Sequence, residues 1–154
     1  LGIRIKLLEN ALDISINVHN RGKVKMPFVF GLHPYFQITD LKSIKIQGLS
    51  SSCFDYQSMS ISDTEHQLNQ LSEGVDFSSI SLEETQLLDL VTGQGIKVHY
   101  QEPMNLSVVW TDPPRSMICI EPWTSPRSAM ISGERLIVLE SGQSQNLRCK
   151  FSFF

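Results

Sequence analysis

Residues 3–19 read IRIKLLENALDISINVH and contain two successive runs of alternating apolar and polar side chains. In the first run isoleucine alternates with arginine and lysine, and in the second leucine, isoleucine and valine alternate with polar residues. A period of two places successive side chains on opposite faces, which is typical of half-buried strands. Because only Glu9 and Asn10 separate the runs, the stretch predicts a β-hairpin with a two-residue connection.

The same period recurs along most of the remaining chain. The closing residues 146–154 place Leu147, Cys149, Phe151 and Phe153 on one face. Further strands are expected at residues 43–48, 86–91, 96–101, 105–111, 117–123 and 135–140. With turn residues between them, about nine or ten strands predict an all-β sandwich or barrel.

Residues 50–84 break this pattern, since they are rich in Ser, Asp, Gln and Glu and hold few apolar residues. We expect a long excursion there, with one short helical turn near Leu82. Long loops inside compact domains are usually functional or mobile. Nothing else suggests a linker, so the chain is expected to form a single domain over residues 1–154.

Composition excludes several classes of protein. Of 154 residues, 41% are hydrophobic and 19% charged, which argues for a soluble globular core and against a disordered chain. The formal net charge is −3, so no nucleic-acid partner is expected. No apolar run approaches the roughly 18 residues of a membrane span, so no membrane partner is expected either.

Cysteine usage points to a reducing compartment. Cys53, Cys119 and Cys149 are an odd number at wide, irregular spacing, which makes a poor disulfide framework. Cys119 and Cys149 fall in apolar strand-like runs and are expected to be buried, inert thiols. The first ten residues lack the apolar core of a signal peptide, and a cytoplasmic location is expected.

Residues 26–36 form the densest candidate for chemistry. Their apolar run is interrupted by His33, which Pro34 restricts to an extended backbone beside Tyr35. A histidine held in this way suits proton transfer near neutral pH. The alternative is a core histidine whose hydrogen bonds are satisfied.

A second candidate lies at residues 118–124, where Glu121 ends an apolar strand two residues before Trp123. A carboxylate beside an aromatic ring is common in sugar sites, because the ring offers an apolar platform and the carboxylate accepts hydroxyl hydrogen bonds. The alternative is an ion pair with Arg115, Arg127 or Arg135.

The third segment, residues 139–144, predicts on its own only a tight turn made by Gly142. The histidines and cysteines share no metal-ligand spacing, so no metal site is predicted. Nucleotide-binding and serine-hydrolase motifs are also missing from the sequence.

Taken in order, FGLHPYF (residues 30–36), ICIEPWTSP (118–126) and LIVLESGQS (136–144) resemble the aldose 1-epimerase, or galactose mutarotase-like, family and its hexose-phosphate epimerase relatives. The resemblance implies a β-supersandwich and interconversion of the α and β anomers of a hexose or hexose phosphate, with no cofactor. It assigns proton transfer at the ring oxygen to His33, and pocket roles to Glu121, Trp123 and Tyr35.

The sequence departs from the family at the position of the general base. The resemblance places that glutamate just after the glycine of the last turn, where this chain has Gln143. A neutral amide hydrogen-bonds a hydroxyl but does not take its proton, and losing a general base typically costs about 10²–10⁴ in rate. Either Glu121 or Glu140 substitutes, or turnover is weak, or the protein binds sugar without epimerising it.

A second departure is coverage, because the resemblance begins in the middle of the family's chain. Leu1 is therefore expected to be a cut, and residues 1–154 to be the C-terminal portion of a larger supersandwich. A missing N-terminal segment or a homodimer would cover the edge formed by residues 3–7. The rival functions are a carbohydrate-binding module with weakened catalysis and a β-sandwich interaction domain that binds no sugar.

Overall fold

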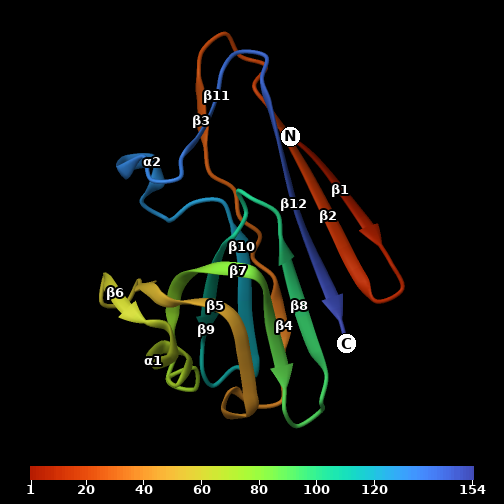
Figure 1. Ribbon diagram of the computed structural model, residues 1–154, viewed down its shortest axis with the longest axis vertical. Coiled ribbons are helices and arrows are strands. Elements are labelled where there is room, and N and C mark those ends of the chain that lie inside the picture. Colours follow the sequence, from red (N-terminus) through yellow and green to blue (C-terminus); the bar gives the residue numbers. More distant parts are fainter.

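Ten antiparallel strands form one curled sheet in the computed structural model, which describes residues 1–154 (Figure 1). Its main path runs β1 (Gly2–Leu7), β2 (Ala11–His19), β12 (Ser144–Phe153), β8 (Gly95–Tyr100), β7 (Asp76–Asp89), β9 (Leu106–Thr111), β10 (Met117–Trp123) and β4 (Tyr35–Gln37). β5 (Ile44–Asp55) pairs with β7 and with β6 (Ser60–Asp63). A separate ribbon pairs β3 (Met26–Phe28) with β11 (Ile137–Leu139).

Helical structure is limited to α1 (Thr64–Leu68), α2 (Ala129–Ser132) and a 3₁₀ turn at Leu41–Ser43. The all-β prediction is therefore confirmed. Neither α-helix has the length and apolar character needed to cross a lipid bilayer.

The predicted N-terminal hairpin is confirmed, with Leu7 opposite Leu12 and Ile5 opposite Ile14. β2 buries its isoleucines against β12, whereas every residue of β1 is exposed at the edge of the sheet. The apolar face of β1 carries Ile3 and Ile5 into solvent. An unpaired apolar edge of this kind favours association with another strand.

Curling of the sheet closes the hydrophobic core. Phe36 of β4 packs against Phe151 of β12, with ring centroids 6.0 Å apart, although these strands lie well apart in the sheet order. The core between them includes the fully buried Phe77, Val109 and Ile118. The far strands are thereby brought together, and the β3–β4 connection runs along the edge of β10.

The prediction of a long excursion at residues 50–84 is wrong. They hold the second half of β5, β6, α1 and the first half of β7, and the short helix is α1 instead of a turn at Leu82. In the first half of β7, Ser78, Ser79 and Ser81 are buried, so the apolar alternation is lost from the sequence. Ser79 is buried and its hydroxyl donates to the Ser52 carbonyl oxygen at 3.0 Å, which satisfies the polar group inside the sheet.

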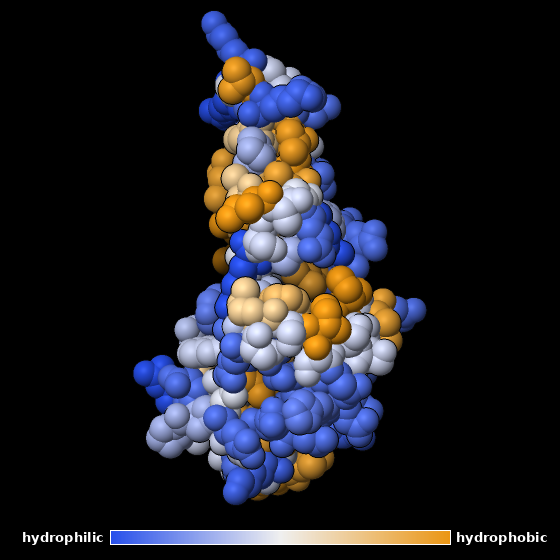
Figure 2. All heavy atoms as spheres, turned by 90° about the vertical axis from the view of Figure 1, so that its left-hand side faces the viewer, coloured by the Kyte–Doolittle hydropathy of each residue, from blue (hydrophilic) through white to orange (hydrophobic).

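The β3–β11 ribbon extends away from the sheet at the top of Figure 1. Figure 2 shows apolar side chains gathered on this upper part of the molecule among polar ones. Val24, Val29 and Val138 are exposed apolar residues of this region. All three cysteines are free and buried, as predicted for Cys119 and Cys149.

Candidate functional site

The connection between β3 and β4 is fastened along the end of β10. The Leu32 N–H donates to the Pro122 carbonyl oxygen at 3.1 Å, and the Thr124 N–H donates to the Phe30 carbonyl oxygen at 2.9 Å. Gly31 forms a β-bridge with Trp123. These bonds determine where His33 stands relative to the side chains of β10.

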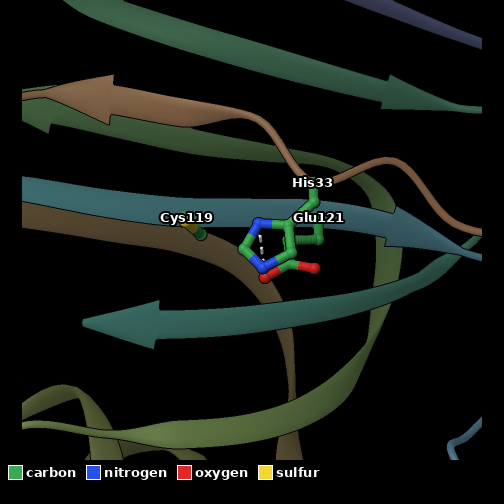
Figure 3. Close-up of side chains that lie close together, drawn as sticks. All are labelled: His33, Cys119 and Glu121. Atoms are coloured by element: carbon green, nitrogen blue, oxygen red, sulfur yellow. Dashed lines mark ion pairs between the residues drawn. The ribbon is translucent and has the colours of Figure 1, made fainter. Parts of the chain in front are cut away.

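His33 and Glu121 converge at this junction. Figure 3 shows His33 reaching from the β3–β4 connection toward Glu121 and Cys119, which both project from β10. The His33 Nδ1 atom lies 3.4 Å from Glu121 Oε1, and the Glu121 side chain is 2% exposed while that of His33 is 51% exposed. One member of the pair is therefore buried and the other is open to a ligand.

Two aromatic rings hold the His33 imidazole. The Tyr35 ring stacks on it with centroids 4.9 Å apart and an interplanar angle of 6°, and the Trp110 ring meets it edge-on at 6.0 Å. The structure places Tyr35 beside His33; its predicted role in substrate binding stays a prediction, and Trp110 is a neighbour that the sequence does not single out. Trp110 lies opposite Cys119 across the β9–β10 pair, and only that register brings it to the site.

Burial raises the pKa of Glu121 to about 7, because desolvation penalises the ionised carboxylate. The indole hydrogen bond from Trp123 and the positive charge of Arg127 act in the opposite direction, and the charge of Asp76 adds to the rise. A carboxyl group with a pKa near 7 exchanges its proton readily at neutral pH, as general acid–base catalysis requires.

Trp123 positions this carboxylate. Its indole N–H donates to Glu121 Oε2 at 3.0 Å, which leaves Oε1 facing His33. The Arg127 guanidinium lies 5.7 Å from the centroid of the Trp123 ring and 4.0 Å from that of Tyr56. Arg127 is fixed in turn by a two-point ion pair with Asp76, at 2.8 and 2.7 Å.

Gly31 leaves the space that the Trp123 indole occupies. A Cβ atom on Gly31 would lie 2.5 Å from Trp123 Cδ1, so the ring must move. We expect Gly31→Ala to lower the free energy of unfolding by about 1–3 kcal/mol, the usual cost of overpacking. NMR should show the indole N–H resonance shifted as its bond to Glu121 lengthens. Gly2→Ala is the matched control, because a Cβ there meets nothing within 4 Å; equal effects of the two variants would contradict this packing.

A cavity of about 290 Å³ adjoins His33, and its walls include Gly31, Trp123 and Arg127. Arg127 also borders a larger cavity of about 530 Å³, to which Arg135 and Tyr56 belong. Drug-sized ligands occupy sites of about 300–1,000 Å³. The cavity therefore offers room for a small ligand beside the His33 imidazole and the Trp123 indole, whereas the Glu121 carboxylate lies behind them and is not part of its wall.

The arginines proposed as partners of Glu121 have other partners. Arg127 pairs with Asp76, and Arg115 pairs with Asp112 at 3.3 Å. Arg135 donates to the carbonyl oxygens of Thr124 and Pro103. The side chain paired with Glu121 is His33, so the alternative of an arginine–Glu121 ion pair is not what the structure contains.

Gln143 is not brought to this cluster. β11 runs antiparallel to β3 with Leu139 opposite Met26, so the chain passes Met26 and continues away from the β3–β4 connection. The β11–β12 turn accordingly lies at the top of Figure 1, beside the β2–β3 connection. There Gln143 Oε1 accepts from the Glu140 N–H at 2.8 Å, and its carbonyl oxygen accepts from the Asn20 N–H.

Among residues able to hold a metal ion, His33, Cys119 and Glu121 have ligand atoms within 4.8 Å of one another. Cys119 was expected to be an inert buried thiol. The two-residue periodicity of β10 places it on the same face as Glu121, and this signal is visible in the sequence once the strand is assigned.

Comparison with known proteins shows that residues 1–152 match the family model described as aldose 1-epimerase. Among solved structures, the Slr1438 protein of Synechocystis sp. PCC 6803 is 27% identical in sequence, with a TM-score of 0.91. The superposition covers 98% of this chain and 53% of the Slr1438 chain. A galactose mutarotase-like protein from Clostridium acetobutylicum is 13% identical with a TM-score of 0.82, covering 99% and 55%. A galactose mutarotase related enzyme from Lactobacillus acidophilus is 14% identical with a TM-score of 0.76, covering 99% and 60%.

These likenesses confirm the expected mutarotase-like fold. The chain spans little more than half the length of the structures it resembles. The search of curated protein sequences finds no match.

Proposed function

Because this chain belongs to the aldose 1-epimerase family, we propose that it interconverts the α and β anomers of a hexose with His33 and Glu121 as its proton-transfer pair. The observation that carries the proposal is the approach of the His33 imidazole to the buried Glu121 carboxylate, at 3.4 Å, beside a cavity.

The reaction needs two proton transfers and no redox step. A base removes the proton of the anomeric hydroxyl while an acid protonates the ring oxygen, and the C1–O5 bond breaks to give the open-chain aldehyde. Rotation about C1–C2 and reclosure by the reverse transfers yield the other anomer. Groups held in position are sufficient for this chemistry, since orientation and proton transfer lower the barrier together.

We assign the base to Glu121 and the ring-oxygen acid to His33. Glu121 has its second oxygen held by Trp123 and a pKa of about 7, so the ionised form is available at neutral pH. His33 is half exposed between Tyr35 and Trp110, where a sugar ring oxygen can reach it. Of the bases considered from the sequence, Glu121 is the carboxylate that lies beside His33.

Trp123 then acts as a positioning residue, because its indole N–H holds the Glu121 carboxylate in place. This role replaces that of a platform on which the sugar stacks. Tyr35 supports the imidazole by stacking and borders the sugar.

A test of the base assignment is Gln143→Glu. We expect kcat/KM for anomer interconversion to stay unchanged, because residue 143 lies in the β11–β12 turn away from His33. A polarimetric assay of both proteins with α-D-glucose decides it. An increase in kcat/KM of tenfold or more in the variant would instead show that the general base belongs at position 143.

Unphosphorylated hexoses are the proposed substrates. The arginines of the neighbouring cavity are engaged by the protein, Arg127 by Asp76 and Arg135 by Asn105 and two carbonyl oxygens. A phosphate group would have to displace these partners. We expect faster turnover of glucose than of glucose 6-phosphate in the same assay; the reverse order would overturn this choice.

The second candidate function is sugar binding with weakened catalysis. The observation that favours it is the neutral Gln143 in the motif position where the resemblance places a general base. Calorimetry with galactose and glucose separates the two functions when combined with polarimetry: binding without acceleration of anomer interconversion supports the binding module.

Residues outside 1–154 are proposed to complete the sheet, in keeping with relatives of nearly twice this length. The open β1 edge, with Ile3 and Ile5 exposed, is where an added strand would pair. Alternatively, a second copy would cover it, which sedimentation at several concentrations would reveal. The free, buried cysteines fit the proposed cytoplasmic location.

A further inference from the structure

A third reactive side chain adjoins the His33–Glu121 pair. Cys119 precedes Glu121 by two residues on β10, so both side chains project from the same face of the strand. Figure 3 shows Cys119 and Glu121 on β10, with the His33 ring next to the Glu121 carboxylate. The ligand atoms of all three lie within 4.8 Å of one another, and the cysteine forms no disulfide.

This donor set has the chemistry of a zinc site. Zn²⁺ in proteins prefers imidazole nitrogen, thiolate sulfur and carboxylate oxygen, and three protein ligands leave a fourth position for water. The thiolate and the carboxylate together carry two negative charges, which balance the ion. Mg²⁺ and Ca²⁺ prefer oxygen ligands and are disfavoured by the sulfur.

The geometry requires only a small adjustment. Around a tetrahedral Zn²⁺, ligand atoms at the usual bond lengths lie about 3.3–3.6 Å apart. Closing the cluster from 4.8 Å therefore takes a movement of roughly an ångström. Cys119 and Glu121 are fixed on a buried strand, whereas the His33 side chain is 51% exposed and is the ligand that would move, sliding along its stacking contact with Tyr35.

We propose that His33, Cys119 and Glu121 bind Zn²⁺, and that the bound ion inhibits anomer interconversion by occupying both groups of the proton-transfer pair. The inhibition rests on the proposed function, whereas the metal site stands on the geometry alone. On binding, the S–H bond breaks, its proton passes to solvent and the sulfur lone pair bonds to zinc. Glu121 binds as carboxylate and His33 as neutral imidazole, with one water in the fourth position.

Calorimetric titration of the chelator-treated 154-residue chain with Zn²⁺ tests the site directly. We expect one ion per chain, with at least a tenfold weaker affinity in Cys119→Ala and Cys119→Ser, since even changes in outer-shell partners of a zinc site cost about 10–100-fold. Cys149→Ser is the matched control, because Cys149 is an equally buried free thiol on β12. Equal Zn²⁺ affinities in the wild type and both Cys119 variants would overturn the proposal.

A second measurement needs no variant and so does not depend on folding of the mutants. Co²⁺ replaces Zn²⁺ in such sites, and a thiolate ligand gives it an intense near-ultraviolet charge-transfer band. The band is expected in the wild type and its absence would overturn the sulfur ligand. If the chain binds zinc but shows no epimerase activity, the proposed function is contradicted and the zinc site stands. If the chain shows epimerase activity but binds no zinc, only the zinc site is contradicted.

Discussion

Glu121→Gln is expected to lower kcat/KM for anomer interconversion by about 10²–10⁴, the range for loss of a general base. The amide is nearly the same size as the carboxyl group and still accepts the Trp123 N–H, so the change removes the basic oxygen and little else. The measurement is polarimetry with α-D-glucose or α-D-galactose, in the presence of a chelator. Wild-type activity in the variant would remove Glu121 from the chemistry.

The same variant should be more stable than the wild type at alkaline pH. The folded chain holds the pKa of Glu121 at about 7, above its value of 4.5 in a free carboxyl group. Between these values the unfolded chain releases a proton that the folded chain keeps, so the wild type loses stability as the pH rises from about 4.5 to 7. Glutamine does not titrate and escapes this loss.

The expected gain in the free energy of unfolding is on the order of 2–3 kcal/mol at pH 8, and it should vanish below pH 4.5. Chemical denaturation of both proteins across this range measures it. A difference that is independent of pH would mean that burial does not perturb this carboxyl group. Loss of activity together with gain of stability distinguishes a functional carboxylate from a structural one.

His33→Ala is expected to reduce kcat/KM by a similar factor of about 10²–10⁴, because the ring oxygen then lacks its acid. The fold should be little affected, with a change in unfolding free energy within about 1 kcal/mol, since the side chain is half exposed. The variant should therefore be fully folded, which circular dichroism checks, and the loss of activity should appear in kcat.

His99→Ala is the matched control for this variant. The His99 Nδ1 atom lies 3.0 Å from Glu84 Oε2, and its side chain is also partly exposed, so it is a second histidine–glutamate pair outside the site. We expect its replacement to leave kcat/KM unchanged. Comparable losses in both variants would show that the effect of His33→Ala is not specific to the proposed pair.

The sequence predicted those parts of the fold in which one strand face is apolar. The hairpin of β1 and β2 follows from the alternation in residues 3–19. The sequence predicts only the second half of β7 as a strand. The first half buries serines, among them Ser78 and Ser79, and a search for alternating apolar residues does not detect buried polar side chains. Hydrogen bonds from the Ser79 and Ser81 hydroxyls to carbonyl oxygens of β5, formed only after the strands pair, satisfy these polar groups inside the sheet.

The candidate site divides along similar lines. His33, Tyr35, Glu121 and Trp123 were recognised because each stands in a short, distinctive segment, and the structure gathers all four. Whether Gln143 lies near His33 depends on the direction in which the β11–β12 turn points, and the short motif around Gln143 does not determine that direction. The register of β3 against β11 decides that direction, and it takes residue 143 away from the imidazole.

The measurement that bears most directly on the central claim is the polarimetric rate of anomer interconversion for the wild type, Glu121→Gln and Gln143→Glu at equal concentration. Acceleration by the wild type, its loss in Glu121→Gln and an unchanged rate in Gln143→Glu are the predicted results. A wild type that does not exceed the spontaneous rate, or a Glu121→Gln variant as fast as the wild type, would contradict the assignment of His33 and Glu121 as the proton-transfer pair.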